Sequence, residues 1–238
     1  MIINPEDFKK SLYQLELVEK ATLRFVTQAI YDYRESAEEI FKYENDLVAD
    51  IGEDITREAL EAVGVSKIDQ RLFGKIDYKR ARYFFHPEFA LRQALFVDSK
   101  AEKISGQGTA TLQTSQLSMT VKQIRSGSEV RVEGKLPQVI QVNDHKFLTT
   151  TIFVIYYYYV NDKDDNILKR ITIASLPNGM LQDKYNPTVE DTIFIAGRNS
   201  PSRGEDFRVR LSFSRLKKKS KWRVQKIDIP TTELSWVE

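Results

Sequence analysis

Residues 147–160 constrain the fold more than any other part of this chain, because they form one continuous run of apolar, aromatic and β-branched side chains. Such a run is typical of a buried β-strand. Asn161 to Asn166 supplies polar turn residues, and Ile167 to Leu176 is the expected hairpin partner. Alternation along the strand places Tyr156 and Tyr158 opposite Tyr157 and Tyr159, which favours packing on both faces over base stacking. The chain therefore contains a sheet with a buried centre.

The N-terminal part is helical by its pattern. From about Pro5 to Lys42, apolar residues recur at helical spacing among many Glu and Lys residues, which predicts one long or broken amphipathic helix. A second helix is expected from Leu47 to Ala62, capped by Asn45 or Asp46 and ending at Gly64.

The remaining segments complete a mixed pattern. We expect a buried strand at Gln93 to Asp98, because its apolar residues are consecutive, after a break in the chain at His86-Pro87. Other predicted elements are a short strand or turn at 74–78, a polar helix at 109–124, short strands at 130–132 and 193–196, and a C-terminal hairpin of 207–216 and 221–229 with a basic tip at 217–220. The predicted class is α+β (mixed α/β): a central mixed sheet flanked by helices, with an additional C-terminal antiparallel hairpin region.

Composition limits the chemistry. The chain has no cysteine and two histidines, so disulfides, zinc–thiolate sites and cysteine nucleophiles are excluded, and any metal must be held mainly by oxygen atoms. Oxygen ligands favour Mg²⁺, Mn²⁺ or Ca²⁺. No apolar stretch approaches a membrane span and the N-terminus lacks the order of a signal peptide, so we expect an intracellular protein.

Charge is distributed unevenly, although the net value is only +2. Acids outnumber bases from Met1 to Val65, whereas the segment from Arg198 to Lys226 is strongly basic. This asymmetry predicts that the C-terminal third contacts an anion.

Two acidic positions carry the clearest chemical signal. Asp98-Ser99-Lys100 closes the apolar run before it, and Asp77 lies upstream in a separate segment. Carboxylates at adjacent strand ends can hold Mg²⁺ between them, and Lys100 shares a strand face with Asp98, where it can orient or help deprotonate water. The main-chain carbonyl of Ser99 is a further candidate metal ligand.

This arrangement resembles the PD-(D/E)XK nucleases, with Ile76-Asp77 in the first motif and Asp98-Ser99-Lys100 in the second. Ile76 replaces the usual proline. The context from Arg71 to Asp77 and from Arg92 to Lys103 is similar to the SfiI type of type II restriction endonucleases. The resemblance implies one restriction-endonuclease-like domain over 1–238, with a helical part (1–65), a catalytic core (66–125) and a β-rich part for recognition and oligomerisation (126–238). It also implies a bacterial, cytoplasmic, Mg²⁺-dependent homotetramer, with a dimer as the fallback, that cuts double-stranded DNA at an interrupted, GC-rich palindrome.

Other residues are candidates for the same function. Glu58 on the second helix is an accessory catalytic candidate, whereas Asp54 is better explained as an exposed carboxylate. Glu102 shares the face of Asp98 if the strand continues, although it can equally pair with Lys103. His86 is expected to be structural.

DNA contacts are predicted from basic and polar side chains. Arginine can bond guanine edges in a bidentate manner, whereas lysines at a turn are suited to phosphates. The candidates are Arg80, Arg82, Arg198, Asn199, Ser202, Arg203, Lys217, Lys218, Lys219 and Lys221. For the lysines, a solvated turn that prevents edge-to-edge aggregation is at least as good an explanation.

Two alternatives stay open at this point. One is a noncatalytic DNA-binding or scaffold protein on a decayed nuclease fold, in which Asp98 and Lys100 form a mere surface pair. The other is a repair or recombination nuclease of the same superfamily, which would prefer DNA ends or structures over a fixed sequence.

Overall fold

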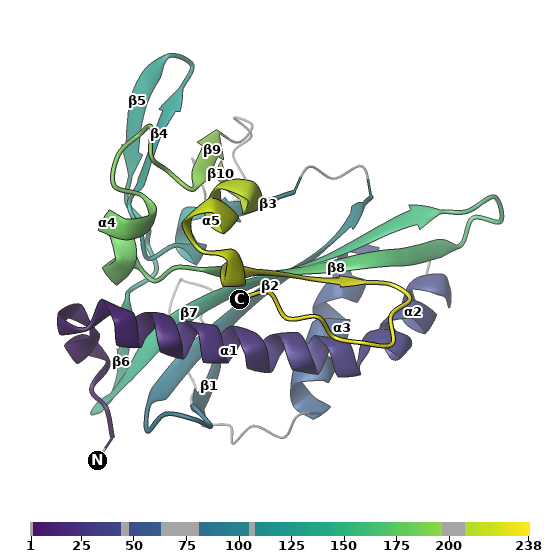
Figure 1. Cartoon of the computed structure of the whole chain (residues 1–238), viewed down its shortest axis with the longest axis horizontal. Coiled ribbons are helices and arrows are strands. Elements are labelled where there is room, and N and C mark those ends of the chain that lie inside the picture. The colour runs from purple at the N-terminus through teal and green to yellow at the C-terminus, as the bar shows by residue number, and fades with distance from the viewer. Residues whose placement is uncertain (1, 44–47, 63–80, 105–107, 197–207) are drawn as a thin grey trace.

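The computed structural model describes residues 2–43, 48–62, 81–104, 108–196 and 208–238. Within these ranges a mixed sheet of six strands forms the centre of the molecule, in the order β1-β2-β7-β8-β11, with β6 also paired to β7 (Figure 1). Its strands are β1 (Arg82–Phe85), β2 (Arg92–Lys103), β6 (Val139–Val142), β7 (His145–Val160), β8 (Asn166–Leu176) and β11 (Val224–Asp228).

The long apolar run forms β7, as predicted. It pairs parallel with β2, so that Asp98 lies beside Phe153, and antiparallel with β8 through the predicted hairpin. Tyr156 and Tyr157 are both buried and belong to opposite hydrophobic clusters, which confirms that the two faces of β7 are covered. Strand β2 extends beyond the predicted end to Lys103, because its parallel pairing with β7 continues as far as Lys103, opposite Tyr158.

Helices cover one face of this sheet. The predicted N-terminal helix is broken into the 3₁₀ helix η1 (Pro5–Lys10), α1 (Leu12–Asp32) and α2 (Arg34–Tyr43), followed by α3 (Val48–Ala62). The predicted caps of the second helix and its Gly64 terminus lie outside the described residues. Apolar side chains of α1, α2 and α3 pack on β2, β7 and β8. None of the helices in the described part of the chain combines the length and apolar character required to cross a membrane.

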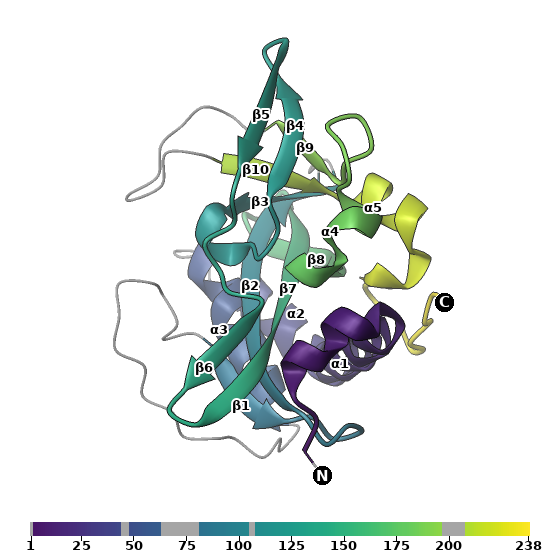
Figure 2. The same cartoon turned by 90° about the vertical axis from the view of Figure 1, so that its left-hand side faces the viewer.

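The opposite face carries smaller elements (Figure 2). A three-stranded sheet has the order β3-β10-β9, formed by β3 (Thr109–Gln113), β10 (Arg208–Ser212) and β9 (Phe194–Ala196). Strands β4 (Val121–Arg125) and β5 (Ser128–Val132) form a hairpin that projects beyond it. The short helices are η3 (Thr114–Gln116), η4 (Gly179–Leu181), α4 (Gln182–Tyr185), α5 (Phe213–Lys219) and η5 (Lys221–Arg223).

The predicted helix at 109–124 is wrong. Its residues form β3, η3 and β4, and the burial of Ala110 and Leu112 alternates with partly exposed threonines, which is the pattern of a strand. Threonine favours strands and glutamine favours helices, so the local preference is mixed, and pairing with β10 decides the outcome.

The predicted C-terminal hairpin is also wrong. Strand β10 pairs with β3 and β9, whereas β11 pairs with β8 in the central sheet. Between them Ser212 caps α5 by accepting a hydrogen bond from the amide of Arg215, and the buried Phe213 and Leu216 have helical spacing. The basic tip at 217–220 therefore forms the end of α5 and the residue that follows it.

Candidate active site

Asp98 and Lys100 lie together on one face of β2. The Lys100 ammonium group donates a hydrogen bond to Asp98 Oδ2 and a second one, at 2.8 Å, to the main-chain oxygen of Thr111. Both side chains are partly exposed, at 20% for Asp98 and 31% for Lys100, so solvent and a ligand can reach them. The predicted pairing of an acid and a lysine on one strand face is present.

Gln116 was not predicted, and it completes this group. Its side-chain nitrogen donates to Asp98 Oδ1 at 2.8 Å, while its side-chain oxygen accepts from the amide of Gln113 at 2.9 Å. Both carboxylate oxygens of Asp98 are therefore oriented by donors, one from Lys100 and one from η3. The sequence does not reveal Gln116, because its pattern predicts a helix over 109–124, whereas the contact with Asp98 depends on β3 and η3.

Ser99 lies on the opposite face of β2, where it fixes the strand to α3. Its hydroxyl donates to Thr56 Oγ1 at 2.7 Å, and Thr56 is within 2.8 Å of the hydroxyl of Tyr156 on β7. Gly52 of α3 packs so closely that a Cβ there would meet the Tyr156 ring at 3.2 Å and the Lys100 backbone at 3.5 Å. These contacts immobilise the strand behind Asp98 and Lys100. A metal-binding role for Ser99 would therefore involve its main-chain carbonyl.

Glu102 extends the acidic character of the same face. Burial raises the pKa of its carboxyl group, and the nearby cations Lys100 and Arg210 oppose that rise. The expectation that Glu102 shares a face with Asp98 and Lys100 is met because β2 continues to Lys103.

Glu102→Gln is expected to stabilise the protein at pH 8 and to have no such effect at pH 4, with EDTA present. The raised pKa means that the folded state holds the proton more tightly than the unfolded chain does, so ionisation destabilises the fold. This penalty is absent below the ordinary glutamate pKa and complete above the raised value. Thermal unfolding across this range measures it, with the exposed Glu133→Gln as the control. A stability difference that does not change with pH would contradict the assignment.

Glu58 is not brought to Asp98. Its carboxylate accepts a hydrogen bond from the hydroxyl of Tyr33, and this bond helps to raise the pKa of Tyr33 to about 12. Helix α3, which carries Glu58, covers the opposite face of β2. The accessory role predicted for Glu58 has no support in this geometry. Asp54 is exposed and pairs with Arg57 at 2.7 Å, as the simpler explanation predicted.

Several predicted site residues lie outside the described residues. They are Asp77, Arg80, Arg198, Asn199, Ser202 and Arg203. In the part of the chain that the structure describes, no group of three or more Asp, Glu, His or Cys side chains is close enough to hold a metal ion. Asp98 is a candidate metal ligand that lies within the described residues, whereas the contribution of Asp77 to the metal site stays a prediction.

The other predicted DNA contacts are distributed over two regions. Arg82 on β1 donates to the main-chain oxygen of Arg57 at 3.1 Å and lies 3.7 Å from Glu61. Lys219 pairs with Asp191 at 2.5 Å, whereas Lys218 and Lys221 are exposed and Lys217 lines a pocket beside α5. Arg82 and Lys219 thus already have protein partners.

His86 is a buried residue with a structural environment. It is 4% exposed, its Nδ1 accepts from the amide of Glu88 at 3.0 Å, and the ring of Phe89 contacts it edge-on at 5.0 Å between centroids. Burial lowers its pKa to about 4, so the ring is neutral at physiological pH.

The buried His86 is expected to make the fold sensitive to acid. Because the folded pKa lies below the ordinary 6.5, stability is lost as the pH falls from 6.5 toward 4, by about 2 kcal/mol at pH 5. Urea unfolding of the wild type and of His86→Gln at pH 7 and pH 5 measures this loss. The free energy of unfolding of the wild type, relative to that of His86→Gln, should be about 2 kcal/mol lower at pH 5 than at pH 7. A difference that stays constant would show that His86 does not titrate in this way.

Comparisons with known proteins identify a family and similar folds. A family model described as type II restriction enzyme SfiI matches residues 32–227. The type II restriction enzyme SfiI of Streptomyces fimbriatus is 39% identical over 237 residues, covering 93% of this chain and 87% of that protein.

Two solved structures are similar over nearly the whole chain. The crystal structure of the tetrameric restriction endonuclease SfiI bound to cognate DNA matches with a TM-score of 0.81 and 35% identity, covering 94% of this chain and 87% of that one. The restriction endonuclease BglI bound to its DNA recognition sequence matches with a TM-score of 0.80, covering 96% and 95%; its 16% identity makes this a likeness of fold alone. The predicted restriction-endonuclease-like fold, with a mixed central sheet flanked by helices, is confirmed.

Proposed function

We propose, because this chain belongs to the SfiI family of type II restriction enzymes, that its Asp98–Lys100 site hydrolyses phosphodiester bonds of duplex DNA at a specific sequence. Membership of this family makes the protein a type II site-specific deoxyribonuclease. The observation that carries the assignment of the site is the contact between the Lys100 ammonium group and the Asp98 carboxylate on one strand face.

Each described group has a distinct part in this proposal. Asp98 supplies carboxylate oxygens that retain free lone pairs after accepting from Lys100 and Gln116. Lys100 is anchored on the Thr111 carbonyl and orients a water molecule toward the phosphate. Gln116 is a positioning residue, since its amide donates a hydrogen bond to the Asp98 carboxylate and does not ionise.

The donor set fits a hard divalent cation. The residues that would hold Mg²⁺ are Asp98 and Asp77, with the carbonyl of Ser99, and oxygen atoms are the ligands that this ion prefers. Mg²⁺ bound there would neutralise charge at the phosphate and lower the pKa of a bound water. Asp98, Lys100 and Gln116 then orient the groups around it.

The assembly and target are part of the same proposal. We infer a homotetramer, with a dimer as the fallback, because two-fold symmetry matches both strands of a palindrome.

The target is an interrupted, GC-rich palindrome, contacted by Arg80, Arg82, Arg198, Asn199, Ser202, Arg203, Lys217, Lys218, Lys219 and Lys221. An enzyme with this substrate works in the bacterial cytoplasm, where DNA is present. The assignment of residues 1–238 to one domain stays a prediction.

Digestion of a sequenced phage genome with and without Mg²⁺ tests this function. The expected result is a set of discrete fragments with Mg²⁺ and intact DNA in EDTA, because water activation requires the cation. Sequencing the fragment ends gives the recognition sequence and the cut position together. Intact DNA under both conditions would refute the nuclease assignment, and cutting confined to ends or branched structures would indicate a repair nuclease.

A further inference from the structure

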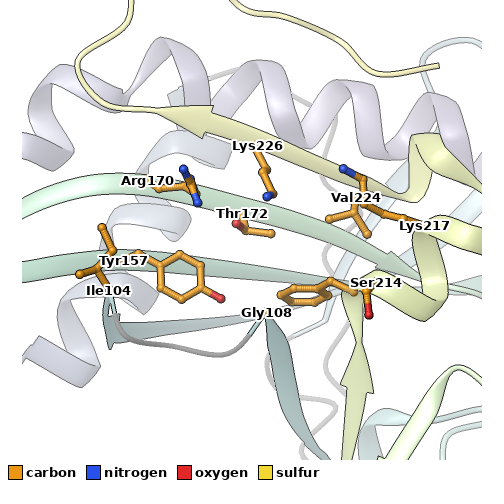
Figure 3. A pocket seen from close by; sticks show the side chains of 10 residues that line it. Ile104, Gly108, Tyr157, Arg170, Thr172, Ser214, Lys217, Val224 and Lys226 are labelled. Atoms are coloured by element: carbon orange, nitrogen blue, oxygen red, sulfur yellow. The ribbon is translucent and has the colours of Figure 1, made fainter.

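A cationic pocket lies on the same face of the central sheet as Asp98 and Lys100. It has a volume of about 250 Å³ and is lined by residues of β7, β8, β11 and α5, among them Tyr157, Arg170, Lys217 and Lys226 (Figure 3). In the sheet register Tyr157 pairs with both Glu102 and Arg170, so the pocket begins one strand away from the acidic end of β2. Thr172 on its floor is two strands, or about 10 Å, from Lys100.

The hydroxyl of Tyr157 is an unused donor in this pocket. The residue is 5% exposed, and its buried hydroxyl has no hydrogen-bond partner among the described residues. Figure 3 shows the ring extending from β7 into the pocket. Burial, together with the charge of Glu102, raises the pKa of Tyr157 to about 12, so the hydroxyl keeps its proton at neutral pH. Buried polar groups normally have partners, and this one is available to a ligand.

Positive charge accumulates around the pocket. Arg170, Lys217 and Lys226 all line the pocket, and the nearby acid Asp228 bonds Arg170 Nε at 2.6 Å. Burial and the charges of Arg170 and Lys217 lower the pKa of Lys226, and Asp228 only partly opposes them. The cations therefore repel one another, and an anion between them would relieve that repulsion.

We infer that this pocket is a second phosphate-binding site, separate from the Asp98–Lys100 site. Lysine and arginine supply charged donors, and a protonated tyrosine hydroxyl supplies a neutral one, which together match the acceptor oxygens of a phosphate group. The group has two possible sources: a phosphodiester of DNA lying across this face of the sheet, or a soluble phosphate. The first source rests on the proposed function, and the second does not.

Two variants and one control test the site. Tyr157→Phe removes only the hydroxyl, and Lys226→Gln removes one charge from an exposed side chain. Lys169→Gln is the matched control, because Lys169 is the neighbour of Arg170 on β8 and lies on the helical face, near Glu38 of α2. All four proteins are purified as full chains and compared at constant ionic strength.

The first experiment tests soluble phosphate as the source. Inorganic phosphate is titrated into each protein, and thermal unfolding and the amide chemical shifts of the pocket strands are followed. If the pocket takes soluble phosphate, the wild type and the control show saturable binding, and Tyr157→Phe and Lys226→Gln weaken it at least about fivefold.

The second experiment tests a DNA phosphate as the source. The binding constant for duplex DNA is measured at several salt concentrations in EDTA, which prevents cleavage. If the pocket takes a DNA phosphate, Lys226→Gln reduces the slope of log K against log salt by about 0.9, and Tyr157→Phe weakens binding without changing the slope. The control leaves both quantities unchanged. If neither variant alters phosphate binding or DNA binding relative to the control, the inference is overturned. The same conclusion holds if the protein binds no DNA at all and neither variant alters phosphate binding.

Discussion

Replacing Asp98 or Lys100 by alanine is expected to slow DNA cleavage by at least about 10³-fold while leaving specific binding within a few-fold of the wild type. Asp98→Ala removes a carboxylate that would hold the cation, and Lys100→Ala removes the ammonium group bonded to that carboxylate and to the Thr111 carbonyl. Neither change reaches the face of β2 that packs on α3, so the fold is preserved. Gel assays with Mg²⁺ measure cleavage, and band-shift assays in EDTA measure binding.

The controls for these variants are exposed residues of the same types. Lys9→Ala and Asp162→Ala change charge by the same amount and lie outside the proposed site. Normal cleavage by Asp98→Ala or Lys100→Ala would show that these residues are not catalytic. Loss of binding together with cleavage would instead assign them to DNA contact.

The largest expected loss of stability comes from the buried pair of Arg223 and Glu19. Both side chains are fully buried, and Arg223 donates to Glu19 Oε2 at 2.6 Å while the amide of Asn178 donates to Glu19 Oε1 at 2.7 Å. The guanidinium group also lies over the ring of Tyr185, 4.4 Å from its centre. The pair joins α1 to η5 and to the end of β8. Arg223→Met leaves the Glu19 charge buried and unpaired, which should lower the free energy of unfolding by about 3–5 kcal/mol.

Urea unfolding at a fixed protein concentration measures this loss. The double variant Glu19→Leu/Arg223→Met removes both charges and should recover most of it, because the penalty arises from the uncompensated partner. Arg131→Met, which breaks the exposed pair of Arg131 and Glu129, is the control and should change stability by less than about 1 kcal/mol. If Arg223→Met is no worse than this control, the buried pair does not stabilise the fold as described.

The parts of the fold that could be predicted are those encoded by local pattern. Strand β7 and its hairpin with β8 follow from consecutive apolar residues and a polar turn, and α1 to α3 follow from helical spacing. Asp98 and Lys100 share a face because residues two apart in any strand do. This part of the site needs no knowledge of the tertiary structure.

The parts that could not be predicted depend on distant partners. Thr109 to Gln113 becomes a strand because β10, about a hundred residues later in the chain, pairs with it. Gln116 reaches Asp98 only after that pairing brings η3 to the middle of β2. The basic C-terminal segment divides between two sheets, and a period-two pattern cannot indicate which sheet a strand will join.

The central position of β7 has a consequence for biosynthesis. This strand pairs with β2, β6 and β8, yet it begins at His145, well after β2 has ended at Lys103. As the chain leaves the ribosome, the N-terminal helices and β2 therefore emerge before the strand that most of the core is built on. Their apolar surfaces stay uncovered until β7 follows, so chaperones are expected to bind nascent chains in this interval. The central sheet is expected to assemble only once Val160 has been released.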